Sequence, residues 1–148
     1  MANHYQNIVI AVDGSKEAEL AFRKSIDVAK RNVGSTLHII HVIDTSMATS
    51  VDMLYDNMVE LIRKHGEILL ESCKLQANDA GVENVKTIMT KGVPKTVLSK
   101  KLSEIVKADL IVCGATGLNA VEQIFIGSNT EAIVRHAKCD VLVIRTPE

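Results

Sequence analysis

The residues best placed for chemistry follow a short apolar run at 110–113. Gly114 and Gly117 come directly after this run, and glycine lets the backbone lie close to a ligand because no Cβ blocks the approach. After nine intervening residues, Gly127 and Ser128 open a stretch with helical periodicity. The unpaired N–H groups and the dipole of a helix start attract anions. Together the two segments are suited to hold a polyphosphate.

Each of these motifs also has a purely structural interpretation. Asp13-Gly14-Ser15, near the amino terminus, has the composition of a tight turn followed by a helix N-cap. Ser128 with Glu131 fits a capping box, in which two side chains satisfy backbone N–H groups at a helix start. The paired glycines fit any tight loop. Taken one at a time the motifs favour these structural roles, whereas their joint spacing favours a nucleotide site.

The elements that would carry these motifs form an alternating pattern. Five short apolar runs alternate with longer segments of helical period, which is typical of βα units around a parallel sheet. Most of the runs are continuously apolar, as expected for strands that helices cover on both faces. The predicted strands are Ile8 to Val12, Leu37 to Ile43, Val85 to Met89, Leu110 to Cys113 and Val141 to Ile144.

Apolar residues at three- and four-residue steps predict four helices and their buried faces. The first is expected to begin after the N-cap Ser15 and to end at a left-handed Gly34. Gly66 weakens the second by about 1 kcal/mol relative to alanine, and Pro94 marks the start of the third. The residues predicted to be buried are Ala18, Phe22, Ile26, Ala29 and Val33; Leu54, Met58, Leu61, Ile62, His65, Ile68 and Leu69; Val97, Leu98, Leu102 and Ile105; and Ile133, Val134 and Ala137.

Composition bounds the classes of partner. The 148 residues carry 17 Lys and Arg against 18 Asp and Glu, so the net charge of −1 favours neither nucleic acid nor an anionic membrane surface. The polar segment 1–7, and the lack of an apolar run near the roughly 18 residues of a membrane span, predict no signal peptide and no anchor. We expect a cytoplasmic protein that binds neither nucleic acid nor membranes.

Neither the cysteines nor the histidines are spaced as metal ligands. Cys73, Cys113 and Cys139 lack the paired spacing of a disulfide framework or a zinc site, which favours buried thiols in a reducing compartment. His38 and His41 are three residues apart on a predicted strand, where alternation points them to opposite faces. No protein metal site is therefore expected.

The spacing of the glycine motif separates it from two better-known phosphate loops. The sequence contains neither Gly-x-x-x-x-Gly-Lys-Ser/Thr nor Gly-x-Gly-x-x-Gly. Gly114, two residues, Gly117, nine residues, then Gly127 and Ser128 resemble the signature of the ATP-binding branch of the universal stress protein family. The similarity also covers Ile8 to Ser15, His41 to Asp44, Gly92 to Pro94 and Cys139 to Ile144. Residues 1–148 are accordingly expected to form one universal stress protein domain.

The resemblance implies a fold and a place for the ligand. The fold is an adenine nucleotide alpha hydrolase-like, doubly wound α/β domain: a five-stranded parallel sheet in the order 3-2-1-4-5 with helices on both faces. The order reverses between strands 1 and 4, and ligands of open α/β sheets lie beyond the carboxyl ends of strands at such a reversal.

The resemblance also implies roles for individual residues. Asp13 would hold the ribose hydroxyls, for which a carboxylate is a natural acceptor, and the Val42 backbone would meet the adenine edge. The phosphates would lie against the glycine motif and Asn129. The expected ligand is ATP, or ADP or AMP, with Mg²⁺. The residues expected at the nucleotide are Ala11, Val12, Asp13, His41, Val42, Cys113, Gly114, Ala115, Thr116, Gly117, Gly127, Ser128, Asn129 and Thr130.

Binding does not imply turnover, because phosphoryl transfer needs cationic groups where charge spreads in the transition state. From 114 to 134 the sequence has no Lys or Arg, and its only charged residues there are Glu122 and Glu131. Family members often carry a basic or His side chain between the first two glycines, where this chain has Ala115 and Thr116. We expect slow or absent hydrolysis and no catalytic residue. A weak ATPase or phosphotransferase, and a nucleotide-free interaction protein, are the alternatives.

The last predicted strand, Val141 to Ile144, lies at a sheet edge in the inferred order. An uncovered edge invites pairing with another chain. In the family that the chain resembles, the last strands pair across a two-fold axis, which implies a homodimer. The function implied is that of a stress-response module that acts through protein partners the sequence does not name.

Overall fold

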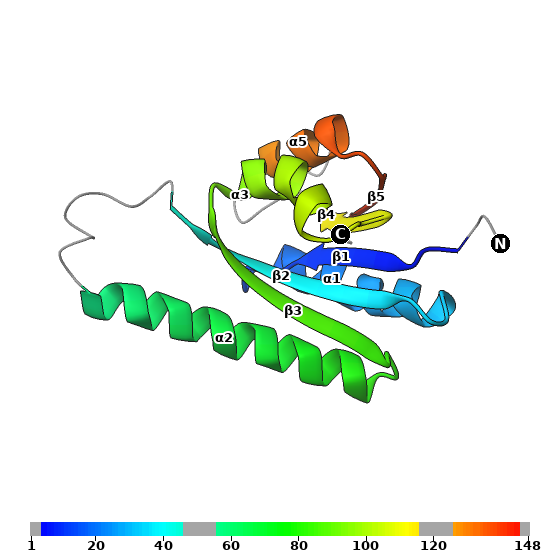
Figure 1. The fold of residues 1–148 in the computed structure, drawn as a ribbon, viewed down its shortest axis with the longest axis horizontal. Helices are drawn as coiled ribbons and strands as arrows, with labels where there is room; N and C mark the ends of the chain where they lie inside the picture. Colours follow the sequence, from blue (N-terminus) through cyan, green and yellow to red (C-terminus); the bar gives the residue numbers. More distant parts are fainter. Residues whose placement is uncertain (1–3, 46–55, 116–125, 146–148) are drawn as a thin grey trace.

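A computed structural model describes residues 4–45, 56–115 and 126–145 (Figure 1). Five parallel strands form one sheet in the order β3-β2-β1-β4-β5. They are β1 (Asn7–Ala11), β2 (Thr36–Asp44), β3 (Asn84–Gly92), β4 (Leu110–Gly114) and β5 (Asp140–Ile144). The predicted α/β class, the five strands and their order are confirmed. β2 and β3 extend further than predicted, and Asp44 still pairs with Gly92.

Helices cover both faces of the sheet (Figure 1). On one face, α1 (Lys16–Arg31) and α2 (Asp56–Asp79) share a core cluster with alternate residues of β1, β2 and β4. The other face packs against α5 (Ser128–His136) and a continuous helical stretch made of α3 (Pro94–Thr96), the π-helical segment η2 (Val97–Lys101) and α4 (Leu102–Ile105).

The central strand β1 is buried on both sides, as its continuous apolar sequence predicts. Ile8 and Ile10 belong to the cluster under α1 and α2, whereas Val9 belongs to the cluster under η2 and α5. All three side chains are fully buried. The site residues that follow β1 are therefore attached to a rigid element.

The N-cap predicted for α1 is present, but the predicted end is wrong. Ser15 caps the helix, and its Oγ accepts a hydrogen bond from Ala18 N at 3.1 Å. The helix ends at Arg31 because the Asn32 side chain donates to Val28 O at 2.8 Å, so Asn32 is the C-cap. Gly34 adopts a φ of +87° in the turn beyond. Val33, predicted to be buried, lies outside the helix and is exposed.

The face of α2 that meets the sheet is also different from the predicted one. Met58, Leu61, Ile62, His65 and Ile68 are exposed, and Leu54 lies outside the described residues. The buried positions on α2 are instead Gly66, Leu70, Cys73 and Ala77, with Leu69 partly buried. This stripe consists mainly of small residues, so it allows the helix axis to approach the sheet closely.

Gly66 shows why small residues face the sheet. A Cβ at this position would lie 2.7 Å from His41 Cδ2 and 2.9 Å from Met89 Cε. The Met89 methyl group is the end of a flexible side chain. The His41 ring is held by a 2.8 Å hydrogen bond from Nδ1 to Val12 O. The close packing of α2 on β2 therefore depends on the missing side chain at position 66.

Two further burial predictions are wrong at helix surfaces. Ile105 in α4 and Val134 in α5 are exposed, although Val97, Leu98, Leu102 and Ile133 are buried as predicted. The π-helical turn of η2 inserts an extra residue into the helical period. Positions beyond it, including Ile105, are therefore rotated relative to a regular helix.

The three cysteines differ in burial. Cys73, Cys113 and Cys139 are all free, with Cys73 buried and the others partly buried. Within 4–45, 56–115 and 126–145, no three His, Cys, Asp or Glu side chains come together as a metal site. No helix in these ranges is both long enough and apolar enough to cross a bilayer.

Replacing Gly66 by alanine should lower the free energy of unfolding by up to about 2 kcal/mol. Overpacking costs about 1–3 kcal/mol, and the gain in helix propensity offsets about 1 kcal/mol of it. Urea denaturation measures the difference. Lys24→Ala, at an exposed position of α1, is the control and should be close to neutral. A more stable Gly66→Ala variant would contradict the packing described for His41.

Candidate functional site

The carboxyl end of β1 presents a carboxylate on a short turn. Val12 is buried, and its N–H donates to Ile40 O of β2 at 2.8 Å. Asp13 follows in an exposed position, where its Oδ1 accepts a hydrogen bond from Ser15 N at 2.9 Å. Gly14 adopts a φ of +83°, with open space where a side chain would be. The turn therefore fixes the Asp13 carboxylate and leaves its Oδ2 without a hydrogen bond to any described residue.

His41 holds the same turn from β2. Val12 O is a carbonyl and can only accept, so the proton of the 2.8 Å hydrogen bond lies on His41 Nδ1. The neutral tautomer of His41 with an unprotonated Nδ1 is therefore excluded. His41 thus supports the main chain beside Asp13, a role that its position in an apolar run did not indicate.

The carboxyl end of β4 is tied to the start of α5. Thr130 Oγ1 donates to Gly114 O at 2.5 Å, and Gly127 N donates to Ala115 O at 2.7 Å. Ala115 N in turn donates to Ile144 O of β5 at 2.8 Å. These contacts bring Gly114 and Ala115 together with the segment from Gly127 to Thr130. Thr116 and Gly117, also predicted site residues, lie outside the described residues.

The start of α5 offers backbone donors. Its N-cap is Gly127, and no side chain caps it. The first hydrogen bond inside the helix runs from Glu131 N to Gly127 O at 2.9 Å. The amides of Ser128, Asn129 and Thr130 therefore precede the hydrogen-bonded ladder, as at any helix start. The capping box considered for Ser128 and Glu131 is absent, since Ser128 is the first helical residue rather than the cap.

Glu131 is the acidic residue in the first turn of α5, and its side chain is paired with Arg135. It accepts a hydrogen bond from Arg135 at 2.8 Å, one turn further along α5. Both side chains are exposed. Pairing with Arg135 offsets part of the repulsion that this carboxylate would exert on an anion at the helix start.

An apolar wall adjoins these polar groups. Ala11, Val42 and Cys113 come from three neighbouring strands and pack against the cluster under η2 and α5. Burial raises the pKa of the Cys113 thiol to about 11, with the Thr130 hydroxyl opposing this shift. The thiol is therefore protonated at neutral pH and contributes an apolar surface rather than a nucleophile or a metal ligand.

The two halves of the site follow adjacent strands and lie at the carboxyl ends of these strands. β1 and β4 are parallel neighbours, with Ile10 opposite Val112, and their carboxyl ends point the same way. Asp13 follows β1, and the start of α5 follows β4. The order of strands reverses between β1 and β4, so these groups lie at the position where open α/β sheets bind ligands.

His38 lies apart from this arrangement. It is buried on the other face of β2, and its Nε2 lies 3.0 Å from Asn7 Oδ1 at the opposite end of β1. Burial, with Lys86 adding to the effect, lowers the pKa of His38. The ring is therefore neutral at physiological pH, as expected for a histidine in the core.

Thr130→Val should lower the free energy of unfolding by about 1–2 kcal/mol, because it leaves the partly buried Gly114 carbonyl without its hydroxyl partner. Thr130→Ser keeps the hydroxyl and should retain most of the stability. Chemical denaturation of the three proteins compares them directly. Equal stability of the Val and wild-type proteins would show that this contact does not fasten α5 to β4.

The chain is similar to known proteins along nearly its whole length. The model of the universal stress protein family matches residues 4–145. A putative universal stress protein of Staphylococcus saprophyticus is 49% identical over 144 residues, which cover 97% of this chain and 86% of that protein. The solved structure of the universal stress protein UspA from Lactobacillus plantarum has a TM-score of 0.85 at 30% identity and covers 96% of this chain and 99% of the other.

Two further solved structures share the fold and carry ligands. One is a universal stress protein in complex with cAMP, with a TM-score of 0.72, 24% identity, and coverage of 98% of this chain and 100% of the other. The second is a universal stress family protein from Arabidopsis thaliana with AMP bound, with a TM-score of 0.68, 19% identity, and coverage of 96% and 92%. At these identities the similarity is one of fold.

Proposed function

Because this chain belongs to the universal stress protein family, we propose that it binds an adenine nucleotide and serves as a regulatory module in a stress response. The observation that carries the proposal is the start of α5, which no side chain caps and which is fastened to β4, the neighbour of the strand that Asp13 follows. Proteins of the same fold are known with cAMP and with AMP bound. We propose that the protein acts in the cytoplasm and that its ligand is ATP, or ADP or AMP.

The polar and apolar parts of the site correspond to the parts of a nucleotide. The amides of Ser128 and Asn129 at the helix start suit phosphate oxygens. Asp13 Oδ2 is available to accept from ribose hydroxyls, since Oδ1 already accepts from Ser15 N. The wall that includes Ala11 and Val42 suits the adenine ring.

Magnesium would enter with the phosphates. The described ranges hold no cluster of three His, Cys, Asp or Glu side chains, so no cage for the ion is found within those ranges. Mg²⁺ keeps several waters and is commonly bound through one or two carboxylates together with substrate phosphates. We propose that it accompanies ATP in this way and neutralises charge that no Lys or Arg between 114 and 134 can offset.

We further propose that nucleotide occupancy, rather than hydrolysis, is the output. The segment from 114 to 134 supplies no cation for the transition state, and Cys113 is protonated. Occupancy would change the surface near α5 that a protein partner meets. β5, at the edge of the sheet, is proposed as the contact of a homodimer through Val141 to Ile144.

Asp13→Asn should weaken ATP binding by about 10- to 100-fold, because hydrogen bonds to a charged group contribute about 1.5–3 kcal/mol. Isothermal titration calorimetry with ATP and Mg²⁺ gives the dissociation constants. Asp27→Asn changes the same group at an exposed position of α1 and should leave the constant unchanged. The proposed site is wrong if Asp13→Asn binds ATP as tightly as the wild-type protein does.

Hydrolysis of ATP should be slower than about one event per second, near the lower end of ordinary enzymes. Single-turnover assays with labelled ATP and excess protein measure the chemical step without product release. A faster rate would contradict the proposal that the site lacks catalytic groups and would favour the ATPase alternative.

A further inference from the structure

The side of α2 that faces away from the sheet carries a second apolar stripe. Six residues follow one another at alternating steps of three and four, and all are exposed: Met58, Leu61, His65, Ile68, Ser72 and Leu75. We call these six residues the outer seam. Steps of three and four are the spacing by which paired helices interlock. At 100° per residue, the outer seam lies about 140° around the helix from the buried stripe at 66, 70, 73 and 77.

The outer seam exposes large apolar groups. Met58 is 52% exposed, Leu61 53%, Ile68 68% and Leu75 53%. Six of the twelve exposed large hydrophobic side chains in the described ranges belong to α2. The helix runs along the outside of β2 and β3, and no helix or strand of the described residues lies on its far side (Figure 1). Several large apolar side chains exposed along one side of a helix indicate an interaction site.

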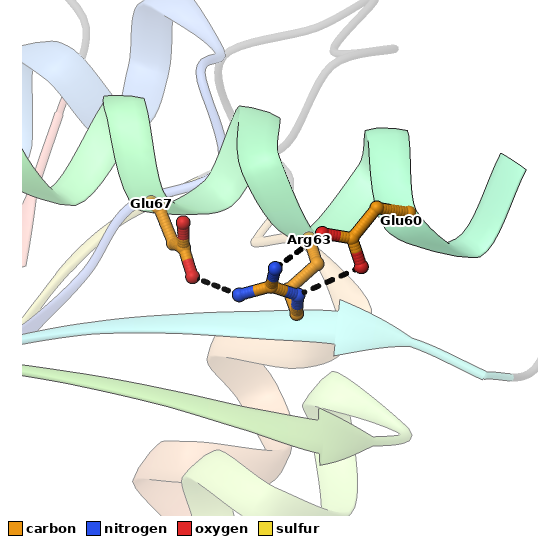
Figure 2. Close-up of polar contacts among 3 residues, drawn as sticks. All are labelled: Glu60, Arg63 and Glu67. Carbon is orange, nitrogen blue, oxygen red and sulfur yellow. Dashed lines mark hydrogen bonds and ion pairs between the residues drawn. The ribbon is translucent and has the colours of Figure 1, made fainter. Parts of the chain in front are cut away.

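The ion pairs on α2 determine which of its charged side chains remain available to contact a partner. Arg63 forms ion pairs with Glu60 and Glu67, its neighbours along the helix (Figure 2). Those three side chains satisfy one another within the chain. Lys64 and Glu71 border the outer seam one heptad apart, and neither takes part in the ion pairs found among the described residues.

The two borders of the outer seam differ in chemistry. One border carries Lys64 and Glu71, and the opposite border carries Ile62 and Leu69. In a parallel pair of identical helices, residues of one border meet the other border of the partner, so Lys64 would lie against the partner's Leu69. In an antiparallel pair each border meets its own kind, so the charged borders face each other and the apolar borders face each other.

We propose that α2 binds α2 of a second copy of this chain in an antiparallel, two-fold symmetric pair. The symmetry places Met58 against the partner's Leu75, Leu61 against the partner's Ser72, and His65 against the partner's Ile68. Lys64 then lies beside the partner's Glu71, and symmetry repeats this opposite-charge contact. Ile62 meets the partner's Leu69 on the other border.

This contact is independent of the nucleotide site and of β5. α2 packs on β2 and β3, at the opposite edge of the sheet from β5. Two different two-fold contacts on one chain join dimers into larger assemblies. A chain that uses both β5 and the outer seam therefore associates beyond the dimer.

The proposal is tested by reversing the two charges in the full-length chain. Sedimentation equilibrium would compare the wild type, Lys64→Glu, Glu71→Lys, the double variant, and an equimolar mixture of the two single variants. Each single reversal places like charges together at both symmetric contacts, so association through α2 should weaken roughly tenfold. The double variant and the mixture restore opposite charges and should regain it. Lys24→Glu, on the exposed side of α1, is the matched control.

The same series made with Val143→Asp, which is aimed at the β5 contact, separates the two interfaces. A remaining monomer–dimer equilibrium that follows the charges at 64 and 71 supports the α2 pair. The proposal is overturned if dimerisation does not depend on these charges. It is also overturned if mixing the two single variants does not restore association. Leu61→Glu should abolish the pair and leave the unfolding midpoint of the monomer unchanged. A lower midpoint would mean that the outer seam is covered within the chain, which also contradicts the proposal.

Discussion

The start of α5 is fastened to the end of β4, and the candidate site depends on this attachment. The Thr130 hydroxyl holds the Gly114 carbonyl, and the Gly127 amide holds the Ala115 carbonyl. Both acceptors lie at the end of a buried strand, so the sheet holds the start of the helix in a fixed position. A helix start fixed in this way presents its unpaired amides at a defined point, which is what recognition of an anion requires.

A second set of contacts, which begins at α2, supports the half of the site that contains Asp13. α2 lies close to β2 because Gly66 has no side chain, and the space is filled by the ring of His41. That ring donates to Val12 O, one residue before Asp13. The packing of α2 on the sheet therefore supports the Asp13 carboxylate beyond the carboxyl end of β1. The neighbouring strands β1 and β4 bring the two halves together, since parallel strands end on the same side.

The parts of the fold that follow from local chemistry could be predicted from the sequence. The five apolar runs are the five strands, Ser15 caps α1, and Pro94 begins α3. The order of the strands came from the resemblance in the glycine motif, because periodicity does not specify which strands are neighbours. Most residues proposed for the nucleotide lie at the carboxyl ends of β1, β2 and β4 or at the start of α5.

What the sequence did not reveal was decided by tertiary contacts. α2 has two apolar stripes, and the larger side chains of Leu61 and Ile68 suggested the wrong one, because the sheet selects the stripe that contains Gly66. Asn32 ended α1 before Gly34 through a side-chain hydrogen bond that competes with the backbone. His41 appeared as one residue in a strand, and its support of Val12 O became visible only when β1 and β2 were side by side.

The most direct measurement of the central claim is a two-dimensional amide NMR titration of the labelled protein with ATP and Mg²⁺. The account predicts saturable chemical-shift changes centred on the amides of Gly127, Ser128, Asn129 and Asp13. The amide signals near His38, which lies beside the opposite end of β1, should not change. Saturable binding whose shifts avoid the start of α5, or the absence of any shift at high ATP concentration, would contradict it.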